Sequence, residues 1–230
     1  GDGWDDSFSG YTGVYAVYHG ILGHTIEIPE GNEESYKAGR NAVLGGIDFL
    51  NQDPDRLLEM RLNFYLRGLN KTEDPKAENE LVGPNGEIVG RVKNGRPKFF
   101  PDYYVIPMSL DKDNDAQEAF NMIDYFKRNG VLVKELKEDI GNYKKGDLVI
   151  DMAQAKRGYA NHILYKGSNE SAWAAMYAEL LVNFPDMRGF KSEPVFADGL
   201  FNGKLGEVTT TRATRTSEID PKAPYYVIAN

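Results

Sequence analysis

The sequence contains no cysteine. Disulfide bonds and thiolate metal sites are therefore excluded, although the absence does not decide the compartment. No apolar stretch approaches the roughly 20 residues of a membrane span. An excess of positive charge is also missing, because the formal net charge is −8 at pH 7. An acidic chain has no basic field with which to displace counterions, which argues against nucleic acid as a partner.

The remaining composition is that of a soluble globular protein. The 230 residues suffice for one large domain or one and a half small ones. Hydrophobic residues make up 41% of the chain and charged residues 27%, which is an ordinary balance. We expect an extracellular or cell-surface protein, although the sequence shows no targeting segment.

An apolar run with one carboxylate organises the first part of the chain. Residues 19–29 read HGILGHTIEIP. Residues 25–28 have the composition of a short strand, which Pro29 ends. Alternation along this strand places Glu27 on the face opposite its isoleucine neighbours. Because a buried carboxylate is costly unless it is paired or used, Glu27 is either a salt-bridged structural residue or a functional one.

The surrounding pattern resembles a known family. The segments GYTG at 10–13, YHG at 18–20 and TIEIP at 25–29 together resemble the closing section of the catalytic domain of zinc carboxypeptidases of the carboxypeptidase A type. The resemblance implies a metallocarboxypeptidase that hydrolyses C-terminal residues from peptides. It implies that Glu27 is the general base, which takes a proton from a zinc-bound water. It also makes Tyr11 the candidate for the tyrosine that covers the substrate, although Tyr11 equally fits a loop residue that packs on its own turn.

The resemblance covers residues 1–70 only. The zinc motif of the family, His-x-x-Glu with a distant histidine, is expected upstream of the general base. We therefore expect a bacterial fragment that carries Glu27 but neither zinc ligands nor activity of its own. Zinc is expected in the full-length parent protein and not in this fragment.

A competing interpretation places a metal within the chain. His24 and Glu27 have the His-x-x-Glu spacing of zinc ligands, and His162 is a conceivable third ligand. Against it, residues three apart on a strand point to opposite faces, and His162 falls in a predicted helix beyond a linker. Ordinary packing explains His19 and His24 as well.

Two helices are predicted next, at 32–51 and 53–68. Asn32 is a suitable cap for the first helix, and Asp53 with Pro54 is a typical start for the second. The second helix is apolar on most sides, so we expect it to be buried, either against the α/β region or in a second copy of the chain. Leu58, Leu62 and Tyr65 share one of its faces and are the expected contacts. We expect residues 1–30, by contrast, to be poorly ordered or to pair with something non-native, unless the fragment forms a dimer.

After a polar linker at 71–82, the sequence pattern becomes that of an α/β domain. A hairpin is predicted at 83–95, followed by strands at 103–107, 131–133 and 148–152, with helices at 116–128 and 154–165. The first two strands and the helix between them form a βαβ unit, so we expect parallel strands. The segment YYVIA at 225–229 repeats YYVIP at 103–107, and we expect the domain to be cut at or within this strand.

The predicted architecture is α/β, with the end of a carboxypeptidase-type mixed α/β domain at 1–70 and a small domain at 83–230. The second domain resembles the glutamine-amidotransferase-like, flavodoxin-like α/β domain that some bacterial zinc carboxypeptidases carry. Amidotransferase chemistry is excluded because the chain lacks a thiolate nucleophile. The alternative function is a non-catalytic binding or docking module, which predicts a concave apolar pocket with convergent polar groups. The expected partners are a peptide substrate in the parent protein and a second copy of the fragment.

Overall fold

The computed structural model of the protein describes residues 10–23, 25–73, 98–108, 116–165, 184–209 and 222–225. The predicted hairpin at 83–95, the helix-to-strand linker beyond residue 73 and the repeated segment at 226–229 lie outside these residues. The helices in the described part are α1 (Thr12–Tyr18), α2 (Glu33–Gln52), α3 (Pro54–Leu69), α5 (Ala116–Arg128), α6 (Arg157–Leu164) and α7 (Phe184–Arg188). The strands are β1 (Tyr103–Ile106), β2 (Lys134–Leu136), β3 (Leu148–Asp151), β4 (Glu193–Val195) and β5 (Leu205–Gly206).

The strands form one sheet in the order β4-β1-β3-β2-β5, and every neighbouring pair is antiparallel. β3 lies between β1 and β2 and pairs with both, with Tyr104 opposite Ile150 and Glu135 opposite Leu148. β1 and β2 therefore run in the same direction, but they are not neighbours. The structure confirms an α/β fold in general terms. The predicted parallel pairing is wrong, because a later strand enters the gap that the β1-α5-β2 crossover leaves.

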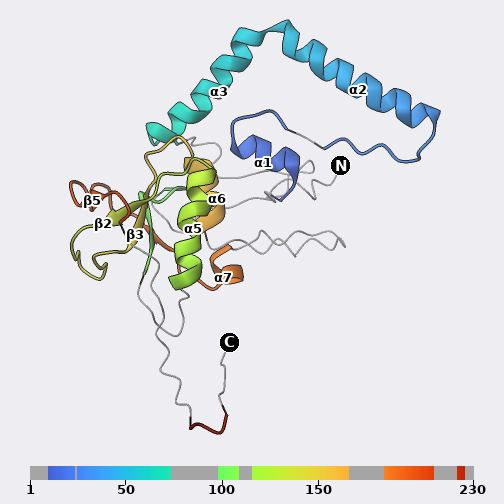
Figure 1. Ribbon diagram of the computed structural model, residues 1–230. Helices are drawn as coiled ribbons and strands as arrows, with labels where there is room; N and C mark the ends of the chain where they lie inside the picture. The colour runs from blue at the N-terminus through green and yellow to red at the C-terminus, as the bar shows by residue number, and fades with distance from the viewer. Residues whose placement is uncertain are drawn as a thin grey trace.

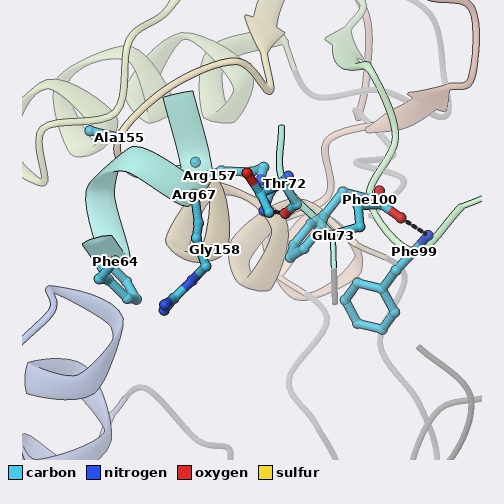
Figure 2. Close-up of a pocket in the computed structure, with 10 residues that line it drawn as sticks. Phe64, Arg67, Thr72, Glu73, Phe99, Phe100, Ala155, Arg157 and Gly158 are labelled. Atoms are coloured by element: carbon cyan, nitrogen blue, oxygen red, sulfur yellow. Dashed lines mark hydrogen bonds between the residues drawn. The ribbon is translucent and has the colours of Figure 1, made fainter. Parts of the chain in front are cut away.

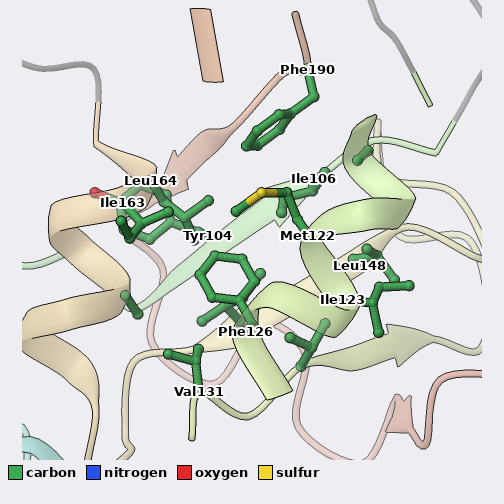
Figure 3. Close-up of a cluster of buried hydrophobic side chains, with 14 of the residues drawn as sticks. Tyr104, Ile106, Met122, Ile123, Phe126, Val131, Leu148, Ile163, Leu164 and Phe190 are labelled. Carbon is green, nitrogen blue, oxygen red and sulfur yellow. The ribbon is translucent and has the colours of Figure 1, made fainter. Parts of the chain in front are cut away.

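The sheet carries a hydrophobic core on each face. Alternation along β1 sends Tyr104 and Ile106 toward α5 and α6, and sends Tyr103 and Val105 to the other side. The larger core packs the apolar face of α5 and the buried side chains of α6 onto the sheet (Figure 3). The smaller core has loops in place of a helix, with Phe201 against Tyr103 at a ring-centroid distance of 4.9 Å. Two layers and a loop cover thus make up the α/β part.

Helices α2 and α3 begin where their caps were predicted. The side chain of Asn32 accepts a hydrogen bond from Ser35 N at 2.9 Å, and that of Asp53 accepts one from Arg56 N at 3.0 Å. Because Asp53 both ends α2 and caps α3, the two helices meet at an angle and extend away from the sheet (Figure 1). α3 returns to the α/β part at its C-terminal end, where it contacts α6.

The predicted burial of α3 is wrong for most of its length. Leu58 is 57% exposed and Leu62 is 53% exposed, and Gly68 is the one fully buried residue of the helix. Tyr65 is half-buried, and its hydroxyl donates to the carbonyl oxygen of His19 at 2.8 Å. The helix therefore packs on the α/β region by its C-terminal turns. Of the three predicted contacts, Tyr65 is made, with Lys156 Nζ 5.1 Å from its ring centroid, whereas Leu58 and Leu62 are exposed. None of the helices in the described ranges is long and apolar enough to cross a membrane.

Two predicted strands are placed differently in the structure. Residues 25–28 form no strand, because nothing in the described part of the chain pairs with them. The strand predicted at 131–133 begins three residues later, as β2. Val131 and Val133 are buried in the larger core, which accounts for their apolar character without a sheet ladder. The expectation of poor order is wrong for α1, while residues 1–9 lie outside the described part.

Candidate functional site

Glu27 lies in the irregular segment between α1 and α2, and its side chain is exposed. No hydrogen bond or ion pair joins its carboxylate to any residue that the structure describes. Tyr11 is the residue that precedes α1, and its carbonyl oxygen accepts from Tyr15 N at 2.9 Å. Among the described residues, Glu27 therefore forms no salt bridge, and no hydrogen bond joins it to Tyr11.

The proposed metal set of His24, Glu27 and His162 receives no support from the described residues. His24 lies outside them. His162 is 4% exposed within α6, and its ring stacks on that of Tyr18 at a centroid distance of 4.4 Å. Within the described ranges, no group of three or more histidine and carboxylate side chains could hold a metal ion.

Helix α1 packs on α5 and α6 through a group of aromatic side chains. The ring of His19 lies between those of Tyr15, at 4.4 Å, and Tyr159, at 4.9 Å. Lys156 Nζ donates to His19 Nδ1 at 2.7 Å, which leaves the ring proton on Nε2, a buried atom with no partner among the described residues. Burial, followed by the positive charge of Lys156, lowers the pKa of His19. The imidazole is therefore kept neutral, and its contacts with Lys156 and Tyr159 connect the end of α1 to the α/β part.

The centre of this group is Tyr159. Its hydroxyl lies 2.6 Å from that of Tyr125, and the side chain is buried. Burial raises the pKa of the Tyr159 hydroxyl, and the hydrogen bond with Tyr125 raises it further. A phenol that resists ionisation is a structural hydrogen-bond donor and a poor nucleophile.

A cavity of about 240 Å³ opens where α3 meets α6 (Figure 2). Phe64 and Arg67 of α3 form one wall, and Phe99 and Phe100 face them from the segment before β1. Gly158 of α6 lines its floor. Beside the cavity, Gly68 of α3 lies close to the turn that precedes α6: a Cβ on Gly68 would lie 2.3 Å from the carbonyl oxygen of Gln154. Aromatic rings line the cavity next to this contact.

Arg157 is the charged group at the centre of this cavity. The residue is 6% exposed, and its Nη2 donates to the carbonyl oxygen of Thr72. The guanidinium lies over the ring of Phe100, 4.2 Å from the centroid. Burial lowers the pKa of Arg157, the negative charge of Glu73 opposes this, and the positive charge of Arg67 adds to it. Arginine nevertheless stays protonated in proteins, so the site holds a fixed, largely desolvated cation.

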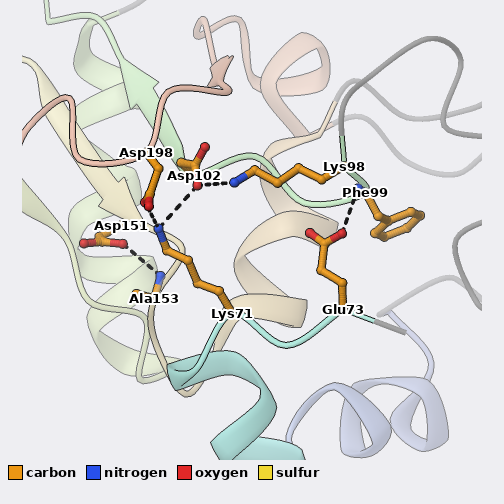
Figure 4. Close-up of polar contacts among 8 residues, drawn as sticks. All are labelled: Lys71, Glu73, Lys98, Phe99, Asp102, Asp151, Ala153 and Asp198. Atoms are coloured by element: carbon orange, nitrogen blue, oxygen red, sulfur yellow. Dashed lines mark hydrogen bonds and ion pairs between the residues drawn. The ribbon is translucent and has the colours of Figure 1, made fainter. Parts of the chain in front are cut away.

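An adjoining cavity of about 250 Å³ shares Glu73, Phe100 and Arg157 with the first. Its other side is an ion-pair network, in which the buried carboxylate of Asp102 accepts from Lys98 and, at 3.3 Å, from Lys71 (Figure 4). Lys71 also pairs with Asp198 at 2.6 Å. Burial opposes protonation of Lys71, but its hydrogen bonds to the two aspartates raise its pKa overall. The hydrogen bonds to the two aspartates therefore keep Lys71 charged, and the network connects the end of α3 to the start of β1.

The sequence interpretation missed this site. Its residues come from three stretches, 64–73, 98–102 and 152–158, which no local pattern brings together. The signal that was available is the occurrence of arginine beside glycine in both helices, at Arg67-Gly68 and Arg157-Gly158. Gly68 permits the close approach, and both arginines line the same cavity.

Comparison of the chain with protein-family models, with curated proteins and with solved structures found no match in any of the three.

Proposed function

We propose that the chain is part of a zinc-dependent metallocarboxypeptidase in which Glu27 is the general base. What supports this is the Thr25-Ile26-Glu27 pattern with the tyrosine and glycine residues before it, and the exposed carboxylate of Glu27 is accessible to a water molecule. An ion-paired structural role was the competing explanation, and no such pair forms among the described residues. In this role Glu27 accepts a proton from the attacking water and gives it to the leaving amine of a peptide. The zinc ligands are expected elsewhere in the parent protein, because the His-x-x-Glu motif of the family lies upstream of the general base.

The surface of α2 and α3 agrees with this proposal. Apolar side chains such as Val43, Leu50, Leu58 and Leu62 are exposed along both helices, and contiguous apolar surface of this kind is unusual in a soluble protein. We propose that other parts of the catalytic domain cover it in the parent protein.

Mutation of Glu27 in the parent protein tests the proposal. Glu27→Gln is expected to lower kcat for release of C-terminal residues by about 10²–10⁴-fold, because general base catalysis contributes that much. Glu34→Gln, on the exposed first turn of α2, is the matched control and should leave kcat unchanged. The 230-residue chain alone should bind no stoichiometric zinc and hydrolyse no peptide. Zinc bound with activity in that chain, or full activity of the Glu27→Gln parent, would refute the proposal.

A second candidate function is a non-catalytic binding module, and the cavity beside Arg157 favours it. A concave site with aromatic walls and a few convergent polar groups is what ligand-binding sites commonly present. NMR screening of small molecules against the chain would test it. We expect resonances of Phe99, Phe100 and Gly158 to shift on binding. A broad screen that shifts none of them would exclude the module.

A further inference from the structure

The cavity at the α3–α6 junction has a surplus positive charge. Arg67 and Arg157 line it together with Glu73, and these are the charged side chains around the first cavity in the described part of the chain. Two cations and one anion leave one positive charge uncompensated, in a chain whose net charge is −8. The cavity is therefore a local exception to the charge of the protein, and a single negative charge would neutralise it.

The arrangement of Arg157 suits a carboxylate. Its guanidinium is held by Thr72 O on one side and by the Phe100 ring on its face, so its orientation is fixed before a ligand arrives. A planar guanidinium binds carboxylate and phosphate through parallel hydrogen bonds. A phosphate dianion would bring a second negative charge next to Glu73, whereas a carboxylate would not. Charge balance therefore favours the carboxylate.

The aromatic side chains that line the cavity suit a ligand with an aromatic ring. Phe64 and Phe99 are half-buried, and together with Phe100 they line the cavity. Apolar surface of this kind gains free energy when a second apolar group displaces water from it. The cavity volume of about 240 Å³ is slightly below the usual range for ligand pockets, so the ligand is small.

We propose that the α3–α6 cavity binds a carboxylate joined by a short linker to an aromatic ring. The ring lies among the phenylalanines, and the carboxylate reaches Arg157 with help from Arg67. This inference deepens the binding-module proposal, on which it rests, and is independent of the role of Glu27. Free arylalkanoic acids and the C-terminal Phe or Tyr of a peptide both have this chemistry.

The first experiment is calorimetric titration of the chain with 3-phenylpropanoate and with its uncharged counterpart, 3-phenylpropanamide. For a ligand of this size we expect a dissociation constant of about 1 mM. The amide should bind at least tenfold more weakly, because it cannot pair with the arginines. If the amide binds as tightly as the acid, the carboxylate proposal is wrong, while the binding module stands. If neither binds, the proposal fails as well.

Substitutions locate the site. A Cβ on Gly158 would meet no atom within 4 Å, so Gly158→Leu is expected to fold normally and to abolish binding by filling the cavity. Arg67→Gln, at the exposed edge, should weaken binding about three- to tenfold, whereas Arg56→Gln on the first turns of the same helix should have no effect. Thermal melts establish that each variant is folded. Unchanged binding in both the Gly158 and Arg67 variants would place the ligand elsewhere and overturn the inference.

Two peptides distinguish the sources of the ligand. A tetrapeptide that ends in Phe with a free carboxyl group is compared with the same peptide amidated at its C-terminus. Tighter binding of the free peptide than of 3-phenylpropanoate identifies a peptide end as the ligand. Weaker binding than 3-phenylpropanoate identifies a free acid. Equal binding of the amidated and free peptides contradicts the proposal.

Discussion

The close approach of α3, at Gly68, to the turn before α6 can be tested by adding one carbon atom. In Gly68→Ala the Cβ would lie 2.3 Å from the carbonyl oxygen of Gln154 and 3.2 Å from that of Ala155. Ordinary contact begins near 3.4 Å, so the two backbones must separate by about 1 Å. Neither oxygen belongs to a flexible side chain that could turn away. Overpacking of this kind costs about 1–3 kcal/mol.

A matched variant separates this clash from the helix propensity of alanine. Alanine in place of helical glycine stabilises a helix by about 0.5–1 kcal/mol. Gly158→Ala is made on the other side of the same junction, where a Cβ meets no atom within 4 Å, so it should show this gain alone. The two variants should therefore differ by about 1–3 kcal/mol in the free energy of unfolding.

Thermal unfolding and amide hydrogen exchange measure the difference. For a chain of this length, 1 kcal/mol corresponds to about 2–4 °C in Tm. The amides at the end of α3 and the start of α6 should exchange faster in Gly68→Ala, because the junction opens. Binding to the α3–α6 cavity should weaken in parallel, since Gly68 lines it. If Gly68→Ala is as stable as Gly158→Ala and its amides exchange at the wild-type rate, the close approach of Gly68 to the turn before α6 does not exist in solution.

Three further predictions concern other contacts. Because the pKa of His19 is lowered in the folded protein, the unfolded chain binds a proton more readily there. The free energy of unfolding should therefore hold above about pH 6.5 and decline as the pH falls below it. The urea midpoint should decline less with falling pH in His19→Gln than in the wild type. Asp102→Asn leaves two lysines beside a buried amide and should cost about 1–3 kcal/mol in the free energy of unfolding. Asp198→Asn, at the exposed end of the Lys71 pair, should cost clearly less, and equal costs would contradict the network. The double variant Leu58→Gln, Leu62→Gln should change the free energy of unfolding by less than about 0.5 kcal/mol per site, because both side chains are exposed. A large loss of stability, together with elution of the wild-type chain as a dimer in gel filtration, would show that a second copy covers this face of α3.

The helix ends could be predicted because their determinants are local. Asn32 and Asp53 each cap a helix through an amide three residues away, so the sequence alone contains the whole interaction. Helix α5 likewise ends with basic residues and with Gly130 at a φ of 74°. These elements are decided within one or two turns of the chain.

The position of β2 could not be predicted because distant residues decide it. Glu135 is buried at the centre of that strand, where a carboxylate is unexpected. Thr209 N donates to its Oε2 at 2.7 Å, and the Thr209 hydroxyl donates to the same carboxylate. The sequence shows a charged residue next to an apolar run. Thr209, 74 residues away, supplies hydrogen bonds that make this charge tolerable, in addition to the ion pair with Lys137 at 3.4 Å. The same reason hides the α3–α6 cavity, whose residues come from three separate stretches.

The insertion of β3 between β1 and β2 determines the order in which this domain can be completed during synthesis. Until residues 148–151 leave the ribosome, β1 and β2 have no shared partner, and their facing backbone groups have only water to bind. The long-range contacts of both hydrophobic cores depend on that late segment, since Leu148 and Ile150 enter one and Val149 the other. Four consecutive residues thus join both halves of the sheet and both cores, and we expect a nascent chain that ends before them to lack the β1 and β2 ladders.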